Sequence, residues 1–129
     1  MKILAVRLKP DQDLKEQLKN IANDEDIQAG FMVTAIGSLK QATIRFANQA
    51  VSTVLNDKFE ILSLNGTIAT TGIHLHIAIA DSQGKTIGGH LDYGCIIYTT
   101  AEIVIGSSSD FRFTRTHDPV TGYNELEIL

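Results

Sequence analysis

The stretch HLHIAIADSQGKTIGGH, residues 74–90, is typical of two β-strands joined by a turn. An apolar run covers 77–80, the tetrapeptide DSQG at 81–84 has the residues that turns favour, and 85–90 runs back beside the first half. Side chains alternate between the two faces of a sheet along each strand. The stretch therefore predicts a β-hairpin whose two strands share a face.

Three of the four histidines of the chain lie in this hairpin. His74 and His76 point to the same face, with Cα atoms roughly 6.5 to 7 Å apart, and the returning strand can bring His90 close to them. Three neutral imidazoles can hold zinc, or another divalent transition metal, and leave a fourth position open. We therefore predict a metal site with room for a small anionic or carbonyl ligand. Hydrolysis, decarboxylation and simple carboxylate binding all fit such a site.

Two features of this hairpin have an alternative interpretation. The three histidines can instead line a subunit interface and pair with carboxylates or carbonyls. Gly88 and Gly89 either allow a close approach of the backbone to a ligand, which makes them candidate ligand-binding residues, or form a bulge at the end of a strand.

The rest of the chain predicts one helix among many strands. Leu14, Leu18 and Ile21 recur at helical spacing after Pro10, so an amphipathic helix should end near residue 23. Residues 50–55 are either a short strand or part of an excursion. Further strands are expected at 2–8, 31–36, 42–47, 59–68, 96–105, 111–114 and 125–128. One helix beside six to eight strands is an α+β fold in which the helix leaves one face of the sheet uncovered, and oligomerisation would cover that face.

Length and composition narrow the class of protein. A chain of 129 residues with 43% hydrophobic content suits one domain covering 1–129. The net charge of −4 and the lack of a basic run argue against DNA binding by this chain alone. Neither a signal peptide nor an apolar stretch of about twenty residues is evident, so we expect a cytoplasmic protein without a membrane partner.

Other polar residues are weaker candidates. Glu60 and Glu102 each interrupt an apolar strand, and a buried carboxylate has to be paired, protonated or metal-bound. We expect Glu60 to form a salt bridge with an arginine and consider Glu102 the better candidate for supporting the site. Arg112 and Arg115 can clamp an anion, although the alternation of Phe and Arg around them favours an ordinary inward and outward pattern.

Two remaining side chains are expected to take no part in chemistry. Cys95 has apolar neighbours and should be a buried structural thiol. His117 precedes an Asp-Pro pair that is typical of a turn, so its side chain should face solvent.

Five motifs, taken in order, resemble the Plants and Prokaryotes Conserved (PPC or PCC) domain, also known as domain of unknown function 296. They are IGSL at 36–39, FEILSLNG at 59–66, HLH at 74–76, GGH at 88–90 and TTAEIVI at 99–105. The resemblance spans nearly the whole chain. It implies an α+β fold with a largely antiparallel sheet, and a homotrimer.

The resemblance also bears on partners. Prokaryotic members of the family are often called predicted DNA-binding proteins, and plant members carry AT-hook segments before the domain. This chain has no RGRP hook, and where plant members read GRFEIL it reads DKFEIL at 57–62. A DNA-associated regulatory or assembly domain is therefore an alternative function rather than the leading one.

The histidine pattern is similar, locally, to the zinc site of bacterial acetolactate decarboxylases. In those enzymes an HxH pair and a later histidine, often after glycines, hold the ion. The similarity carries over only to His74, His76 and His90. It implies a further alternative, a metal-dependent lyase or hydrolase.

Overall fold

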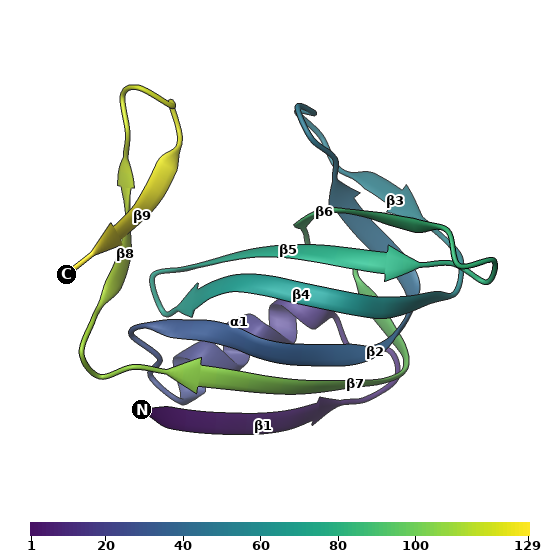
Figure 1. Ribbon diagram of the computed structural model, residues 1–129, viewed down its shortest axis with the longest axis horizontal. Coiled ribbons are helices and arrows are strands. Elements are labelled where there is room, and N and C mark those ends of the chain that lie inside the picture. The colour runs from purple at the N-terminus through teal and green to yellow at the C-terminus, as the bar shows by residue number, and fades with distance from the viewer.

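The computed structural model describes residues 1–129 and contains one helix and nine strands (Figure 1). Strands β1 to β7 form one sheet, β8 and β9 form a separate two-stranded hairpin, and every pairing is antiparallel. The predicted α+β fold is confirmed. The elements are β1 (Lys2–Leu8), α1 (Leu14–Asp24), β2 (Gly30–Arg45), β3 (Thr53–Leu55), β4 (Phe59–Ala69), β5 (Gly72–Ala80), β6 (Thr86–Leu91), β7 (Ile96–Ser107), β8 (Phe113–His117) and β9 (Asn124–Ile128).

The main sheet curls so that β2, in the middle of the strand order, also pairs with β6 at the end of that order. The strand order is β1-β7-β2-β4-β5-β6, with β3 paired to β2, and the last residues of β2 also pair with β6. In that pairing Ile44 lies opposite Leu91 and Arg45 opposite His90. The register of β2 against β7 shifts at three points, and such bulges bend a strand. The curl places Arg45 beside His90.

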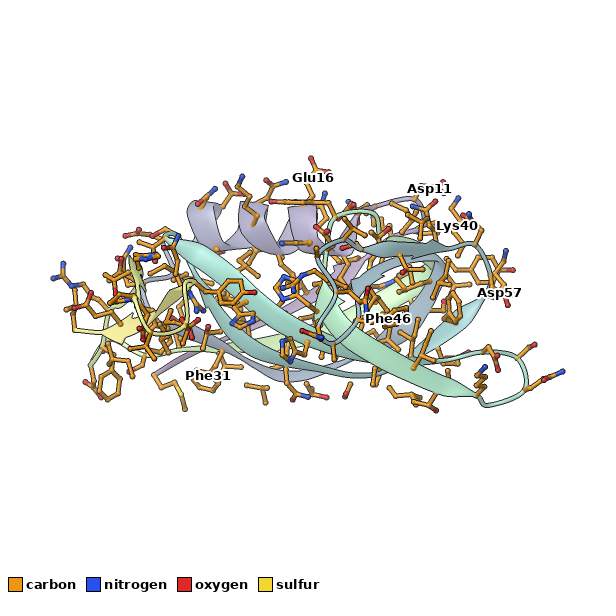
Figure 2. All side chains as sticks on the ribbon, turned by 90° about the horizontal axis from the view of Figure 1, so that it is seen from above. Asp11, Glu16, Phe31, Lys40, Phe46 and Asp57 are labelled. Atoms are coloured by element: carbon orange, nitrogen blue, oxygen red, sulfur yellow. The ribbon has the colours of Figure 1, made fainter.

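Helix α1 covers one face of the sheet. Asp13 caps its first turn by accepting a hydrogen bond from the backbone N–H of Glu16 at 3.1 Å. Figure 2 shows the helix along one side, with Glu16 pointing away from the sheet and Phe31 on the opposite side. The buried face of α1 joins a core of 23 residues that includes Leu14, Leu18, Ala22, Leu75, Ile77 and Ile79. With eleven residues, α1 is too short to cross a bilayer.

The other face of the sheet is open. Ile36 on β2 and Leu62 on β4 alternate with buried neighbours and are 49% and 52% exposed. The expectation that one helix leaves a face uncovered is therefore confirmed.

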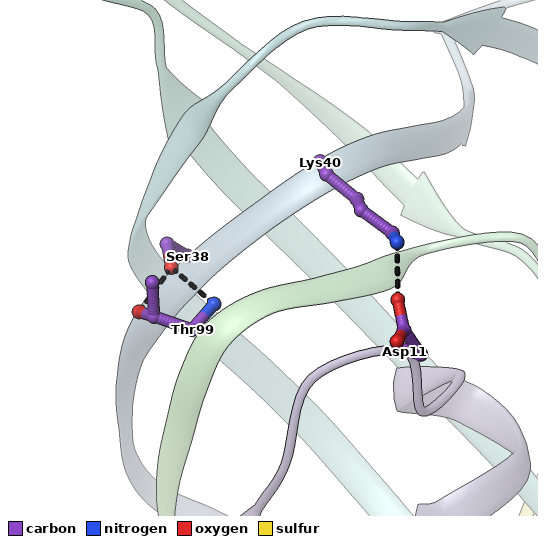
Figure 3. Close-up of polar contacts among 4 residues, drawn as sticks. All are labelled: Asp11, Ser38, Lys40 and Thr99. Atoms are coloured by element: carbon purple, nitrogen blue, oxygen red, sulfur yellow. Dashed lines mark hydrogen bonds and ion pairs between the residues drawn. The ribbon is translucent and has the colours of Figure 1, made fainter.

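Polar contacts hold the middle of β2 in place (Figure 3). The hydroxyl of Ser38 lies 2.8 Å from that of Thr99 on β7 and accepts the backbone N–H of Thr99 at 3.2 Å. Lys40 forms an ion pair with Asp11 in the turn before α1. These contacts connect β2 to both β7 and the start of the helix.

Two sequence predictions are corrected in detail, and one open alternative is decided. The strands expected at 31–36 and 42–47 are parts of one strand, because the polar stretch between them continues the pairing through bulges. Residues 50–55 contain the short strand β3. The strand expected at 111–114 begins at Phe113 instead and continues to His117, which lies opposite Asn124, the first residue of its partner β9.

Candidate metal centre

The β5–β6 hairpin brings the three histidines together on the face of the sheet away from the core. Leu75 and Ile77 are buried, so alternation places His74 and His76 on the opposite face. His90 on β6 lies directly opposite His76 in the register. Side chains of such directly opposed residues are neighbours. The predicted clustering is thus observed.

The imidazoles are close enough to share one ion. Their ring centroids are 5.1 Å apart for His74 and His76, 5.3 Å for His74 and His90, and 5.9 Å for His76 and His90. One ring nitrogen from each residue lies within 4.8 Å of the other two. In tetrahedral zinc, with Zn–N of about 2.0–2.1 Å, ligating nitrogens stand about 3.3 Å apart. To bind one ion, the ring nitrogens would move closer together by up to about 1.5 Å.

The surroundings favour neutral imidazoles. Burial, followed by the charge of Arg45, lowers the pKa of His90 to about 4. Burial also lowers the pKa of His74, with Arg115 as the next cause and Glu125 acting in the opposite direction. Both rings therefore have a free lone pair at neutral pH, which is the form that binds metals.

One ring atom has no partner within the protein. Nδ1 of His90 is buried and makes no hydrogen bond. A buried polar nitrogen without a partner loses its hydration and gains nothing in return. A metal ion is one group that would satisfy it, so the donor set fits zinc both in type and in position.

Gly88 and Gly89 let β6 approach its neighbours. A Cβ atom at Gly88 would lie 2.4 Å from the carbonyl oxygen of Ile77, and one at Gly89 would lie 2.6 Å from that of Arg45. The register of β5 with β6 runs through both residues without a shift, so they form no bulge between these strands. The glycines thus hold His90 close to β5 and β2. Their contact with a ligand stays a prediction.

An open cleft of about 750 Å³ lies beside the cluster. Figure 1 shows the β8–β9 hairpin and the segment after β2 rising on the same side of β5, and both contribute to the cleft. His74 and His90 line it, whereas His76 does not. The other lining residues are Arg45, Asn48, Gln49, Ala50, Ile73, Arg115, Tyr123, Asn124 and Glu125.

The structure separates the two candidate arginines. Arg115 lines the cleft, and its Nη2 donates a hydrogen bond to Thr67 Oγ1 at 2.9 Å. Arg112 lines a different cavity near the N-terminus. The alternation of Phe and Arg was the only sequence signal for either, and it could not tell them apart. Arg45 was missed as a cleft residue, because only the curl of the sheet brings it there.

The two candidate carboxylates lie away from the cluster. Glu102 on β7 is exposed, with Arg7 and Ile36 as its register neighbours. Glu60 on β4 is also exposed and makes no ion pair within 4.0 Å, so no salt bridge with Arg45, Arg112 or Arg115 forms within one chain. Both residues lie on the open face of the sheet, and neither lines the cleft beside the histidines.

The two side chains that were given no chemical role lie as expected. Cys95 is fully buried, and burial raises the pKa of its thiol to about 11. His117 is exposed at the end of β8 and is not part of the histidine cluster.

Comparison with known families and curated proteins gives one matching family model and two matching proteins. The family model described as the Plants and Prokaryotes Conserved (PCC) domain matches residues 1–109. Proteins called bifunctional protein GlmU, from Synechococcus sp. strains JA-3-3Ab and JA-2-3B'a(2-13), are 51% identical over 128 residues. The alignments cover 99% of this chain but 21% and 20% of those proteins, so the chain spans about a fifth of their length.

Solved structures share the fold over almost the full length. A hypothetical protein from Salmonella enterica has a TM-score of 0.97 and 38% identity, covering 99% of this chain and 93% of the other. A protein from Bacteroides thetaiotaomicron, named provisionally as DNA-binding, has a TM-score of 0.86 and 25% identity, covering 97% and 91%. The metal-containing protein AF0104 from Archaeoglobus fulgidus has a TM-score of 0.83 and 26% identity, covering 98% and 94%.

Proposed function

This chain belongs to the Plants and Prokaryotes Conserved domain family, and from that premise we propose that it binds one zinc ion through His74, His76 and His90. The observation that carries the proposal is the convergence of three imidazole nitrogens within 4.8 Å of one another. The similarity to an archaeal protein called metal-containing adds support. The fourth zinc position would accept an oxygen of a small anionic or carbonyl ligand.

Two features of the protein would support the proposed ion: the pairing of β5 with β6 and the cleft beside the histidines. The β5–β6 register sets His76 opposite His90, and the cleft gives a ligand access to the side of the cluster formed by His74 and His90. When bound, zinc would polarise a carbonyl or lower the pKa of a bound water.

The test is the metal content of protein purified without a histidine tag, measured by inductively coupled plasma mass spectrometry. We expect close to one zinc per chain, and near zero in His76→Ala. His117→Ala is the matched control, because His117 is an exposed histidine outside the cluster. Full metal retention in His76→Ala would refute the proposed ligand set. Wild-type protein that stays empty after zinc is supplied would refute the metal site altogether.

We also propose that the protein is a homotrimer. The open face of the sheet, with Ile36 and Leu62 half exposed, is a surface that other subunits would cover. Light scattering should give three times the chain mass of 14.1 kDa, in His76→Ala as well as in the wild type. A monomeric mass for the wild-type protein would rule the trimer out.

A second candidate function is association with DNA, which the naming of the Bacteroides neighbour supports. The net charge of −4 opposes it. Fluorescence anisotropy with duplex DNA across a salt series decides the matter, because phosphate binding weakens steeply as salt rises. Absence of binding at low salt would eliminate this candidate.

A further inference from the structure

Two arginines flank the histidine cluster from different parts of the chain. Arg45 ends β2, Arg115 lies in β8, and both line the cleft. Neither has a carboxylate within 4.0 Å, since the only ion pairs are Lys2–Glu25 and Lys40–Asp11. Arg45 makes one long hydrogen bond, 3.4 Å, to the carbonyl oxygen of Gln49. The cleft thus contains two guanidinium groups without an anionic partner.

The C-terminal hairpin holds Arg115 in a defined position. The hairpin is tied to the sheet where the N–H of Phe113 donates to the carbonyl oxygen of Gln28 at 2.8 Å and the hydroxyl of Thr71 donates to the carbonyl oxygen of Phe113 at 2.6 Å. The stem of Arg115 passes over Gly72, where an added Cβ would lie 3.3 Å from its Cγ.

The tip of Arg115 is anchored as well. Its Nη2 donates to Thr67, which lies opposite His74 in the β4–β5 register. The guanidinium is therefore partly immobilised beside a proposed metal ligand, and little side-chain freedom is left to lose when an anion binds.

We propose that Arg115 binds the carboxylate of a small organic acid, and that a neighbouring carbonyl or hydroxyl oxygen of the same acid occupies the open position of the metal. This inference rests on the proposed function. A guanidinium presents several N–H groups in a plane that matches a carboxylate, and the hydrogen bond to Thr67 uses only one nitrogen of Arg115. Arg45 adds a second positive charge to the same cleft.

The two arginines are not the only charged residues of the cleft. Glu125 also lines it, so its negative charge offsets part of the positive charge of Arg45 and Arg115. A fixed carboxylate in the cleft repels a dianion more than a monoanion. A small monocarboxylate with a neighbouring carbonyl or hydroxyl oxygen is the ligand that satisfies both the metal and Arg115.

The proposal gives the C-terminal hairpin the role of ligand recognition. The family match ends at residue 109, whereas Arg115, Tyr123, Asn124 and Glu125 all lie beyond it and line the cleft. The histidines lie inside the matched region. In this arrangement the matched region holds the ion and the hairpin selects the acid.

The experiment is isothermal titration calorimetry of zinc-loaded protein with pyruvate, with the metal content of each sample measured in parallel. Loss of a hydrogen-bonded charge predicts roughly ten- to hundredfold weaker pyruvate binding in Arg115→Gln at unchanged metal content. Arg115→Lys keeps the positive charge but lacks the planar guanidinium, so its affinity for pyruvate should lie between those of the wild type and Arg115→Gln. Arg112→Gln is the matched control, since Arg112 lies outside this cleft, and it should bind pyruvate as the wild type does.

Methyl pyruvate makes the comparison specific for the carboxylate. It keeps the carbonyl but lacks the negative charge, so its affinity should be the same in wild type and Arg115→Gln. Circular dichroism of each variant checks that it is folded, and Arg115→Lys serves if Arg115→Gln is not.

Several results would overturn the inference. Equal pyruvate affinity in wild type and both Arg115 variants would remove Arg115 from the ligand site. Zinc-loaded wild type that binds neither pyruvate nor lactate would refute the ligand class and leave the metal site standing. Tighter, Arg115-dependent binding of inorganic phosphate would replace the carboxylate with a phosphate. Protein that takes up no zinc would refute the metal site and this inference with it.

Discussion

Zinc should raise the melting temperature of this protein by about 10 °C, and His76→Ala should abolish the rise. An ion that binds only the folded state stabilises it by about 2.7 kcal/mol when its free concentration is a hundredfold above Kd. For 129 residues, an unfolding entropy of about 2.1 cal/mol/K per residue sums to roughly 270 cal/mol/K. Dividing the first quantity by the second gives the expected shift of about 10 °C.

His76 is a suitable residue for this test because its replacement should hardly affect the fold. It is exposed on the open face of the sheet, and its imidazole makes no hydrogen bond to another protein group. Surface substitutions of this kind change stability by about 0.5 kcal/mol or less. Metal-free His76→Ala should therefore melt within about 2 °C of the metal-free wild type.

The assay is thermal unfolding followed by circular dichroism, with free zinc set by a buffering chelator and then removed with excess chelator. His117→Ala should show the full, reversible rise, which separates specific binding from general effects of zinc. An unchanged rise in His76→Ala, or loss of the rise in His117→Ala, would show that the ion does not bind at the cluster.

Three further outcomes follow from the packing and the charges. Gly89→Ala should lower the free energy of unfolding by about 1–3 kcal/mol and weaken zinc binding, because its Cβ would lie 2.6 Å from the carbonyl oxygen of Arg45. Urea unfolding measures the first effect and metal titration the second. Zinc affinity equal to that of the wild type would contradict the reasoning. Leu18→Ala, at a fully buried site, should lower the unfolding free energy by about 2–5 kcal/mol, whereas Val120→Ala, 91% exposed, should change it by about 0.5 kcal/mol at most; equal effects would place Leu18 outside the core. The pKa of His90 is about 4 in the folded state, against 6.5 for an ordinary histidine. Between pH 6.5 and 4, His90 therefore binds a proton in the unfolded chain but stays neutral in the folded metal-free protein. The unfolding free energy should thus fall as pH drops from 6.5 towards 4, and His90→Gln should flatten that fall in urea titrations.

The hairpin was predictable from the sequence, but its register was not. A turn centred within 81–84 is evident from residue types alone, yet moving the pairing by one residue would turn His90 to the buried face. In the structure the side chain of Asp81 accepts the N–H groups of Gln83 and Lys85, both at 2.9 Å, and Gly84 adopts a φ of +80°. This loop sets His76 opposite His90. Loop geometry of this kind is decided by individual hydrogen bonds rather than by periodicity.

The sequence named Arg115 as one of two possible anion-binding arginines, but it could not predict that Arg115 and Arg45 lie in the same cleft. Arg45 reaches His90 only because β2 bends through its bulges until it meets β6. Arg115 reaches Thr67 only because a hairpin with its own small ladder docks onto the β4–β5 turn. Both are tertiary contacts between segments far apart in the chain. Local patterns of apolar and polar residues carry no information about them.

The unpaired polar groups of the site are better explained by ligand binding than by a role in stabilising the fold. A buried Nδ1 on His90 without a hydrogen bond, and two arginines that lower the pKa of nearby imidazoles without a carboxylate partner, each cost stability in the free protein. Packing does not require any of them, because the core on the other face of β5 is closed by Leu75, Ile77 and Ile79. A cation at the imidazoles would occupy the free lone pairs, and a carboxylate at Arg115 would neutralise the charge that the cation and the arginines add. The two proposed ligands therefore stabilise each other, so an acid should bind the zinc-loaded protein far more tightly than the metal-free one.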